Sequence, residues 1–218
     1  MTDNITLEVC IENCSRLEEL AEKGADRVEL NDNMAVGGTT VSLGVAEYAI
    51  PRCHRAGIKV MSMIRPRGGN FVYSEYELSI MLRDLEILCG LETDGLVFGC
   101  LTPSGSLDKE KMLRLAGAAG FGSSGKKPEL VIHMAFDQIN QNEQLDSLRW
   151  LADNGITRIL THGSADQGIP IKNNYKRLKE YIAAGGIEIL PGGGVTKDNF
   201  REICADLQIK QAHGTLIL

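Results

Sequence analysis

The sequence predicts a (β/α)8 barrel, the TIM-type α/β fold with eight parallel strands, formed as a single domain by residues 1–218. Short apolar runs rich in β-branched residues alternate with amphipathic segments, which is typical of parallel strands covered by helices. A chain of 218 residues is long enough for such a barrel. An open doubly wound sheet is the alternative, but it would have edge strands, and every predicted strand here is apolar enough to be buried.

The predicted strands repeat one pattern, in which a glycine ends a helix and an apolar run follows it. This pattern covers residues 24–30, 57–61, 94–98, 155–160 and 186–190, and segments 6–10, 129–136 and 211–217 complete the eight strands. Helices are expected at residues 15–23, 40–56, 74–90, 108–119, 143–154, 172–184 and 197–206. Capping boxes at Ser15-x-x-Glu18 and Ser74-x-x-Glu77 predict where two of these helices start.

The sequence ends at Leu218, directly after the eighth predicted strand, so the eighth helix is expected to be missing or replaced. Its absence would expose apolar surface on the first and last strands, which a second subunit could cover. We therefore expect a homodimer or a higher homo-oligomer. The Gly/Ser-rich segment 117–127 is expected to be a mobile loop on the side opposite the functional face.

Composition limits the classes of partner and the compartment. The net charge is −6 with a pI near 5.3, and no basic stripe appears, so we expect no nucleic-acid partner. Residues 1–4 do not resemble the start of a signal peptide, and no apolar run approaches the roughly 18 residues of a membrane span. Six cysteines without a CxxC pair indicate reduced thiols and a cytoplasmic protein.

Segment 61–73 carries the clearest sign of ligand binding. Arg65 and Arg67 share one face of an extended chain, because side chains alternate with period two. Gly68 and Gly69 follow them and would let a ligand approach the backbone. Two guanidinium groups at the carboxyl end of a barrel strand predict an anion-binding site.

Polar residues of the same phase occur near the ends of the other predicted strands. The candidates for acid–base chemistry are Glu8, Glu29, His133 and Asp137, and the candidates for substrate binding are Arg65, Arg67, Thr161, Gly192, Gly193 and Gly194. Consecutive glycine N–H groups that open onto a helix form a cradle for an anion.

Each of these candidates also has a structural interpretation. Glu8, Glu29 and Arg65 could form an internal ion-pair network, because charges are seldom buried without a partner. His133 and Asp137 could be a buried pair, and the glycines could form a tight turn. Met61 and Met63 are expected to fill the barrel.

Metal binding is a separate hypothesis. Cys10 and His213 lie on strands that become neighbours when the barrel closes, so they could share a metal ion. Cys100 follows the fourth strand and lies too far from Cys10 to bind the same ion. The residues alone favour a small anionic ligand over copper.

Taken together, the motifs resemble those of the CutC family, known as copper homeostasis proteins. The motifs that carry the resemblance are Leu7-Glu8-Val9-Cys10, residues 24–30, Ile64-Arg65-Pro66-Arg67-Gly68-Gly69, His133-x-Ala135-Phe136-Asp137 and Pro191-Gly192-Gly193-Gly194-Val195. The resemblance implies a cytoplasmic barrel that binds or handles copper. Met134 and His162 depart from it, since arginine and serine are usual there. Two hypotheses follow: a copper-binding homeostasis protein, or a barrel enzyme or sensor for a small phosphorylated or carboxylated metabolite.

Overall fold

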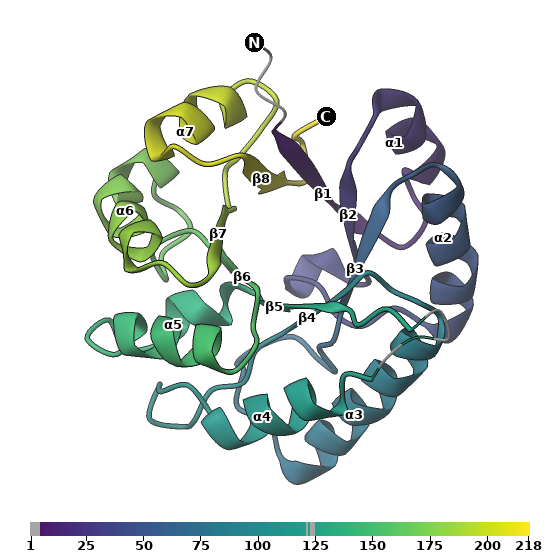
Figure 1. Ribbon diagram of the computed structural model, residues 1–218, viewed down its shortest axis with the longest axis horizontal. Coiled ribbons are helices and arrows are strands. Elements are labelled where there is room, and N and C mark those ends of the chain that lie inside the picture. Colours follow the sequence, from purple (N-terminus) through teal and green to yellow (C-terminus); the bar gives the residue numbers. More distant parts are fainter. Residues whose placement is uncertain (1–4, 121, 123–124) are drawn as a thin grey trace.

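The computed structural model describes residues 5–120, 122 and 125–218, which form a nearly closed barrel of eight parallel strands with helices on the outside (Figure 1). The strands are β1 (Thr6–Glu12), β2 (Arg27–Asn31), β3 (Lys59–Met63), β4 (Gly95–Phe98), β5 (Glu129–Ile132), β6 (Arg158–Thr161), β7 (Glu188–Pro191) and β8 (Gln211–Gly214). They pair in the order β7-β6-β5-β4-β3-β2-β1-β8. The predicted fold class is confirmed.

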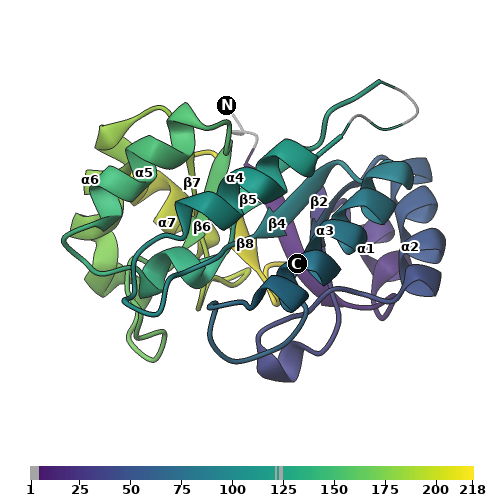
Figure 2. The same cartoon turned by 90° about the horizontal axis from the view of Figure 1, so that it is seen from below.

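Helices flank the strands on both sides in the view of Figure 2. The α-helices are α1 (Leu17–Lys23), α2 (Leu43–Arg55), α3 (Glu75–Gly90), α4 (Lys109–Ala118), α5 (Gln144–Asp153), α6 (Tyr175–Ala184) and α7 (Phe200–Leu207). Three short 3-10 helices, η1 (Met34–Val36), η2 (Met134–Gln138) and η3 (Ile171–Asn174), lie in the segments that follow β2, β5 and β6.

One of the two predicted capping boxes, at Ser74, is present. At α3 the Ser74 hydroxyl accepts from the Glu77 N–H while the Glu77 carboxylate accepts from the Ser74 N–H. The predicted box at Ser15 is wrong, because its hydroxyl donates to the Glu12 carbonyl and α1 begins at Leu17 without a side-chain cap.

The interior of the barrel contains an apolar layer that the strand register defines. Met63 on β3, Val97 on β4 and Val131 on β5 are partners across neighbouring strands. They pack with Met61 in one buried cluster. The prediction that the two methionines fill the barrel is confirmed.

The barrel closes differently on the side of β7 and β8. These two strands are neighbours in space, but within the described residues no ladder joins them, and a single parallel bridge links Thr196 to Leu216 beyond their ends. In the described part of the chain no helix follows β8. Leu216 is 65% exposed there.

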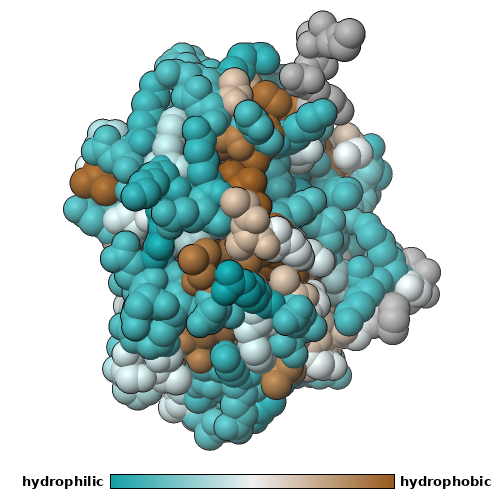
Figure 3. Space-filling model, turned by 60° about the vertical axis from the view of Figure 1, so that its left-hand side comes forward, coloured by the Kyte–Doolittle hydropathy of each residue, from teal (hydrophilic) through white to brown (hydrophobic). Residues whose placement is uncertain are grey.

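Apolar side chains also reach the outer surface. Figure 3 shows a narrow band of hydrophobic residues on a face that is otherwise mainly hydrophilic. The exposed large hydrophobic residues among those described are Val36, Leu43, Tyr48, Tyr76, Leu113 and Leu216, of which only Leu43 and Tyr48 share an element, α2. The homo-oligomer stays a prediction.

Two expectations concern segments that the structure describes only in part. Residues 1–4, on which the absence of a signal peptide was argued, lie outside the described residues, as do 121, 123 and 124 of the loop predicted at 117–127. Among the helices that are described, none combines the length and the apolar composition that crossing a membrane requires.

Candidate functional site

A cavity of about 500 Å³ lies at the carboxyl ends of the strands, where barrels of this kind place their sites. Seven of the predicted site residues line it: Cys10, Glu29, Arg65, His133, Gly193, Gly194 and His213. The remaining lining is largely apolar and includes Met63, Phe71, Met134, Leu160, Val195 and Leu216. Arg65, His133 and Gly193, which follow three different strands, thus line one cavity.

Glu8 lies beneath the cavity and holds His213. The His213 Nδ1–H donates to Glu8 Oε1 at 2.7 Å, and Arg27 donates to the other oxygen of the same carboxylate. Burial raises the pKa of Glu8, but the Arg27 and His213 charges outweigh it and hold that pKa well below its usual range. Burial lowers the pKa of His213, while Glu29 and Glu8 raise it above its usual value. The imidazole is therefore fixed by a carboxylate and favours its charged form.

Cys10 lies beside Glu29 and below η1. Its Sγ is 3.4 Å from Glu29 Oε2 and 3.7 Å from the Met34 Sδ, and it accepts from the Asn31 amide at 3.3 Å. The His213 Nε2 is 3.9 Å from Glu29 Oε2. The ligand atoms of Cys10, Glu29 and His213 all lie within 4.8 Å of one another. Burial and the neighbouring Glu29 raise the pKa of the Cys10 thiol well above its usual value.

The two arginines of the loop after β3 do not share a target. Arg65 is buried and lines the cavity, whereas Arg67 is not part of the lining. The Arg67 guanidinium pairs with Glu77 and donates to the carbonyls of Asn70 and Val72, so it holds the loop against α3. The prediction that both arginines point to one site is wrong, because Glu77 and the loop backbone bind the second.

The alternative interpretation in which Arg65 belongs to an internal ion-pair network is also wrong. The Arg65 Nη atoms donate to the carbonyls of Val36, Gly38 and Gly69. Among the described residues no carboxylate lies within ion-pair distance of Arg65. Glu8 pairs instead with Arg27 and His213.

His133 is locked in one neutral tautomer. Its Nδ1 accepts from the Ala135 N–H at 3.1 Å, so the proton is on Nε2. Burial and the Arg65 charge lower the pKa of His133 to about 3. The Nε2 atom is buried and has no partner in the described structure. The ring stacks near Phe71, with 4.9 Å between ring centroids.

The alternative interpretation of His133 and Asp137 as a buried pair is wrong. Strand β5 ends at Ile132 instead of residue 136, and η2 turns Asp137 away from the cavity. The Asp137 carboxylate accepts from the Thr161 hydroxyl and from the N–H groups of His162 and Gly163. Burial raises its pKa to about 6 despite these three donors. Asp137 and Thr161 thus hold the end of β6 and do not line the cavity.

The glycine loop after β7 reaches the cavity through Gly193 and Gly194, while Gly192 is not part of the lining. His162 fixes this loop, since its Nδ1 is 3.2 Å from the Gly192 carbonyl and 3.1 Å from the Gly193 carbonyl. Gly193 has φ +78°, and a Cβ there would lie 2.9 Å from His162 Nδ1. Helix α7 begins only at Phe200, so the expected opening of the glycines directly onto a helix is wrong.

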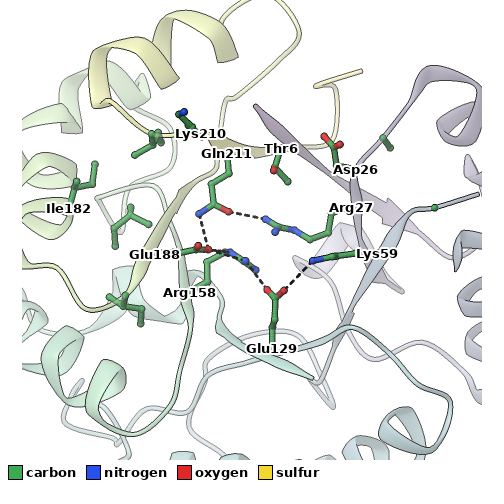
Figure 4. Close-up of a pocket in the computed structure, with 15 residues that line it drawn as sticks. Thr6, Asp26, Arg27, Lys59, Glu129, Arg158, Ile182, Glu188, Lys210 and Gln211 are labelled. Carbon is green, nitrogen blue, oxygen red and sulfur yellow. Dashed lines mark hydrogen bonds and ion pairs between the residues drawn. The ribbon is translucent and has the colours of Figure 1, made fainter. Parts of the chain in front are cut away.

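A second, larger hollow of about 800 Å³ lies at the amino ends of the strands (Figure 4). Arg158 donates to Glu129 and Glu188, and Gln211 links Glu188 to Arg27. These groups form a charged floor that closes the barrel, which we assign to stability because barrel sites lie at the other end.

Three residues that shape the site, Arg27, Met34 and Phe71, are not among the predicted site residues. Arg27 could have been found, because it has the same strand phase as Glu29 and Asn31. Met34 and Phe71 could not, since each is brought to the cavity by a loop whose path the strand pattern does not define.

Comparison with known proteins shows to which family the chain belongs. A sequence model of the CutC family matches residues 5–218. The chain belongs to the CutC family. A CutC family protein of Enterococcus faecalis is 44% identical over 214 residues, which are 97% of this chain and 99% of that protein.

A human copper homeostasis protein cutC homolog is 36% identical over 200 residues, which are 90% of this chain and 68% of that protein. The crystal structure of a CutC protein from Streptococcus agalactiae superposes with a TM-score of 0.91 at 45% identity, covering 98% of this chain and 100% of that one. Within this CutC chain, Met134 lines the cavity and His162 holds the glycine loop. The two residues at which the sequence is expected to depart from the family pattern therefore lie in the cavity lining and beside it.

Proposed function

We propose that this CutC protein takes part in copper homeostasis by binding a copper(I) ion at Cys10, His213 and Met34. The spacing of the side chains carries the proposal. Bonds of about 2.3 Å to sulfur and about 2.0 Å to nitrogen place the ligands of a shared ion roughly 3.5 Å apart. The Cys10 Sγ–Met34 Sδ distance of 3.7 Å is close to that value, and the ligand atoms of Cys10 and His213 lie within 4.8 Å of each other.

The chemistry of the donors fits a soft ion. Thiolate and thioether sulfur select copper(I), and imidazole is compatible with it. Glu8 supports His213 as carboxylates commonly support metal-bound histidines, since it accepts the Nδ1 proton and leaves Nε2 toward the cavity. The thiol and the imidazolium would release protons when the ion binds. The name of the human relative supports copper as the ion.

The proposal includes a cytoplasmic location. All six cysteines are unpaired in the structure, which fits a reducing compartment. The measurement is an anaerobic titration with copper(I) against a chromogenic chelator. Cys10→Ser and His213→Gln should each weaken binding by more than about 100-fold, since both remove a ligand.

Cys53→Ser is the matched control, because Cys53 is buried in α2 and does not line the cavity. It should bind copper(I) as the unmodified protein does. Equal affinity in Cys10→Ser and the unmodified protein would contradict the proposed site.

A further inference from the structure

Arg65 places an unbalanced positive charge in the wall of the cavity. Its residue is 4% exposed, and within the described chain only backbone carbonyls accept from its Nη atoms. A buried cation without an opposite charge is rare, because removing it from water is costly unless another charge compensates. An anion in the cavity would compensate the charge of the Arg65 guanidinium.

His133 adds a directed hydrogen-bond donor to the same wall. The side chain is buried, its Nδ1 is occupied by Ala135, and its Nε2–H has no acceptor among the residues described. Buried polar groups are nearly always hydrogen-bonded, so an unpaired donor in a cavity lining calls for a ligand oxygen.

The register places these two groups in one row. Met63, Val97 and Val131 are partners, and Arg65, Gly99 and His133 follow them by two residues, just beyond the ends of β3, β4 and β5. Gly99 allows the His133 ring to pack against its backbone, since a Cβ there would lie 2.9 Å from the ring.

The rest of the lining defines the body of the ligand. Phe71 packs against both groups, with its ring 4.9 Å from the Arg65 guanidinium carbon and 4.9 Å from the His133 ring. Met63, Leu160 and Leu216 give the cavity further apolar surface. A short hydrocarbon body would be buried against these side chains.

We propose that the cavity binds a small organic anion, whose carboxylate or phosphate group lies at Arg65 and His133 and whose apolar body contacts Phe71 and the aliphatic lining. This ligand is distinct from the copper ion, whose proposed ligands are Cys10 on β1, His213 on β8 and Met34 on η1. The site needs no covalent step, and the proposal concerns binding alone.

Calorimetric titration of the full chain with acetate, butyrate, hexanoate and methyl phosphate tests this, at constant ionic strength set with chloride. Affinity should rise from acetate to hexanoate by up to about fourfold for each methylene that becomes buried. The methyl phosphate arm distinguishes the two head groups. His133→Asn keeps an acceptor for the Ala135 N–H but lacks the Nε2 donor, and it should weaken binding at least tenfold.

Arg83→Met is the matched control, because it removes the same charge from an exposed residue of α3 that does not line the cavity. It should bind the anions within twofold of the unmodified protein. Cys10→Ser should also retain anion binding, so failure of the copper site and failure of the anion site are distinguishable. Absence of binding by all four anions, or equal binding by His133→Asn, would overturn the proposal.

Discussion

The neutral state of buried His133 makes the stability of this protein depend on pH in a defined direction. Burial and Arg65 lower the pKa of His133 from 6.5 to about 3 in the folded protein. The unfolded chain keeps the ordinary value and binds a proton first as the pH falls. The contribution of neutral His133 to the free energy of unfolding is therefore complete above about pH 6.5. It is lost progressively as the pH falls toward 3.

The size of the effect follows from the linkage relation. Each pH unit below 6.5 costs about 1.4 kcal/mol of unfolding free energy for one fully buried group. Between pH 6.5 and about 4.5 the protein should lose about 2.7 kcal/mol through this residue. His133→Asn has no group that titrates in this range at that position, so it should lack this part of the loss.

Urea unfolding of both proteins at several pH values measures the difference. The difference in unfolding free energy between the unmodified protein and His133→Asn should shrink by about 2.7 kcal/mol from neutral pH to about pH 4.5. Leu151→Ala is a control that destabilises the core of α5 without removing a titratable group. If the unfolding free energies of the unmodified protein and His133→Asn changed with pH in parallel, the assignment of a buried neutral state to His133 would be refuted.

Two further substitutions test the structure around the site. Glu8→Gln leaves buried Arg27 and His213 without their carboxylate and should lower the unfolding free energy by about 3–5 kcal/mol, measured by urea unfolding, and a change below about 1 kcal/mol would contradict the buried ion pairs. Gly193→Ala and Gly194→Ala both place alanine at positive φ, at a cost of about 1 kcal/mol or more, but only the first meets His162, so its melting temperature should fall further, and equal losses would show that His162 moves aside.

Local patterns predict the barrel because each strand and helix carries its own signal. The glycine-ended helices and apolar runs define all eight strands, and alternation correctly buries Glu8, Glu29 and Cys10. For Asp137 the prediction failed because the chain there is no longer a strand. Beyond Ile132 the η2 turn sends Asp137 to β6, and no periodic pattern announces such a turn.

The site was predicted less completely than the fold, because its chemistry depends on which groups are already paired. Arg65 and Arg67 are equivalent in the sequence pattern. Glu77 lies ten residues after Arg67, and only the folded loop shows that it binds Arg67 and leaves Arg65 free for the cavity. The neutral tautomer of His133 likewise follows from a backbone turn.

The Glu8 carboxylate connects charged groups at the two ends of the barrel. One of its oxygens meets Arg27, which reaches Gln211 at the floor, and the other meets His213 in the cavity wall. Binding of a cation in the cavity at the carboxyl ends of the strands therefore alters the electrostatic field on Arg27 and Gln211 at the amino ends. We therefore expect mutations of the charged floor at the amino ends to change the affinity of the cavity for a ligand that they do not contact.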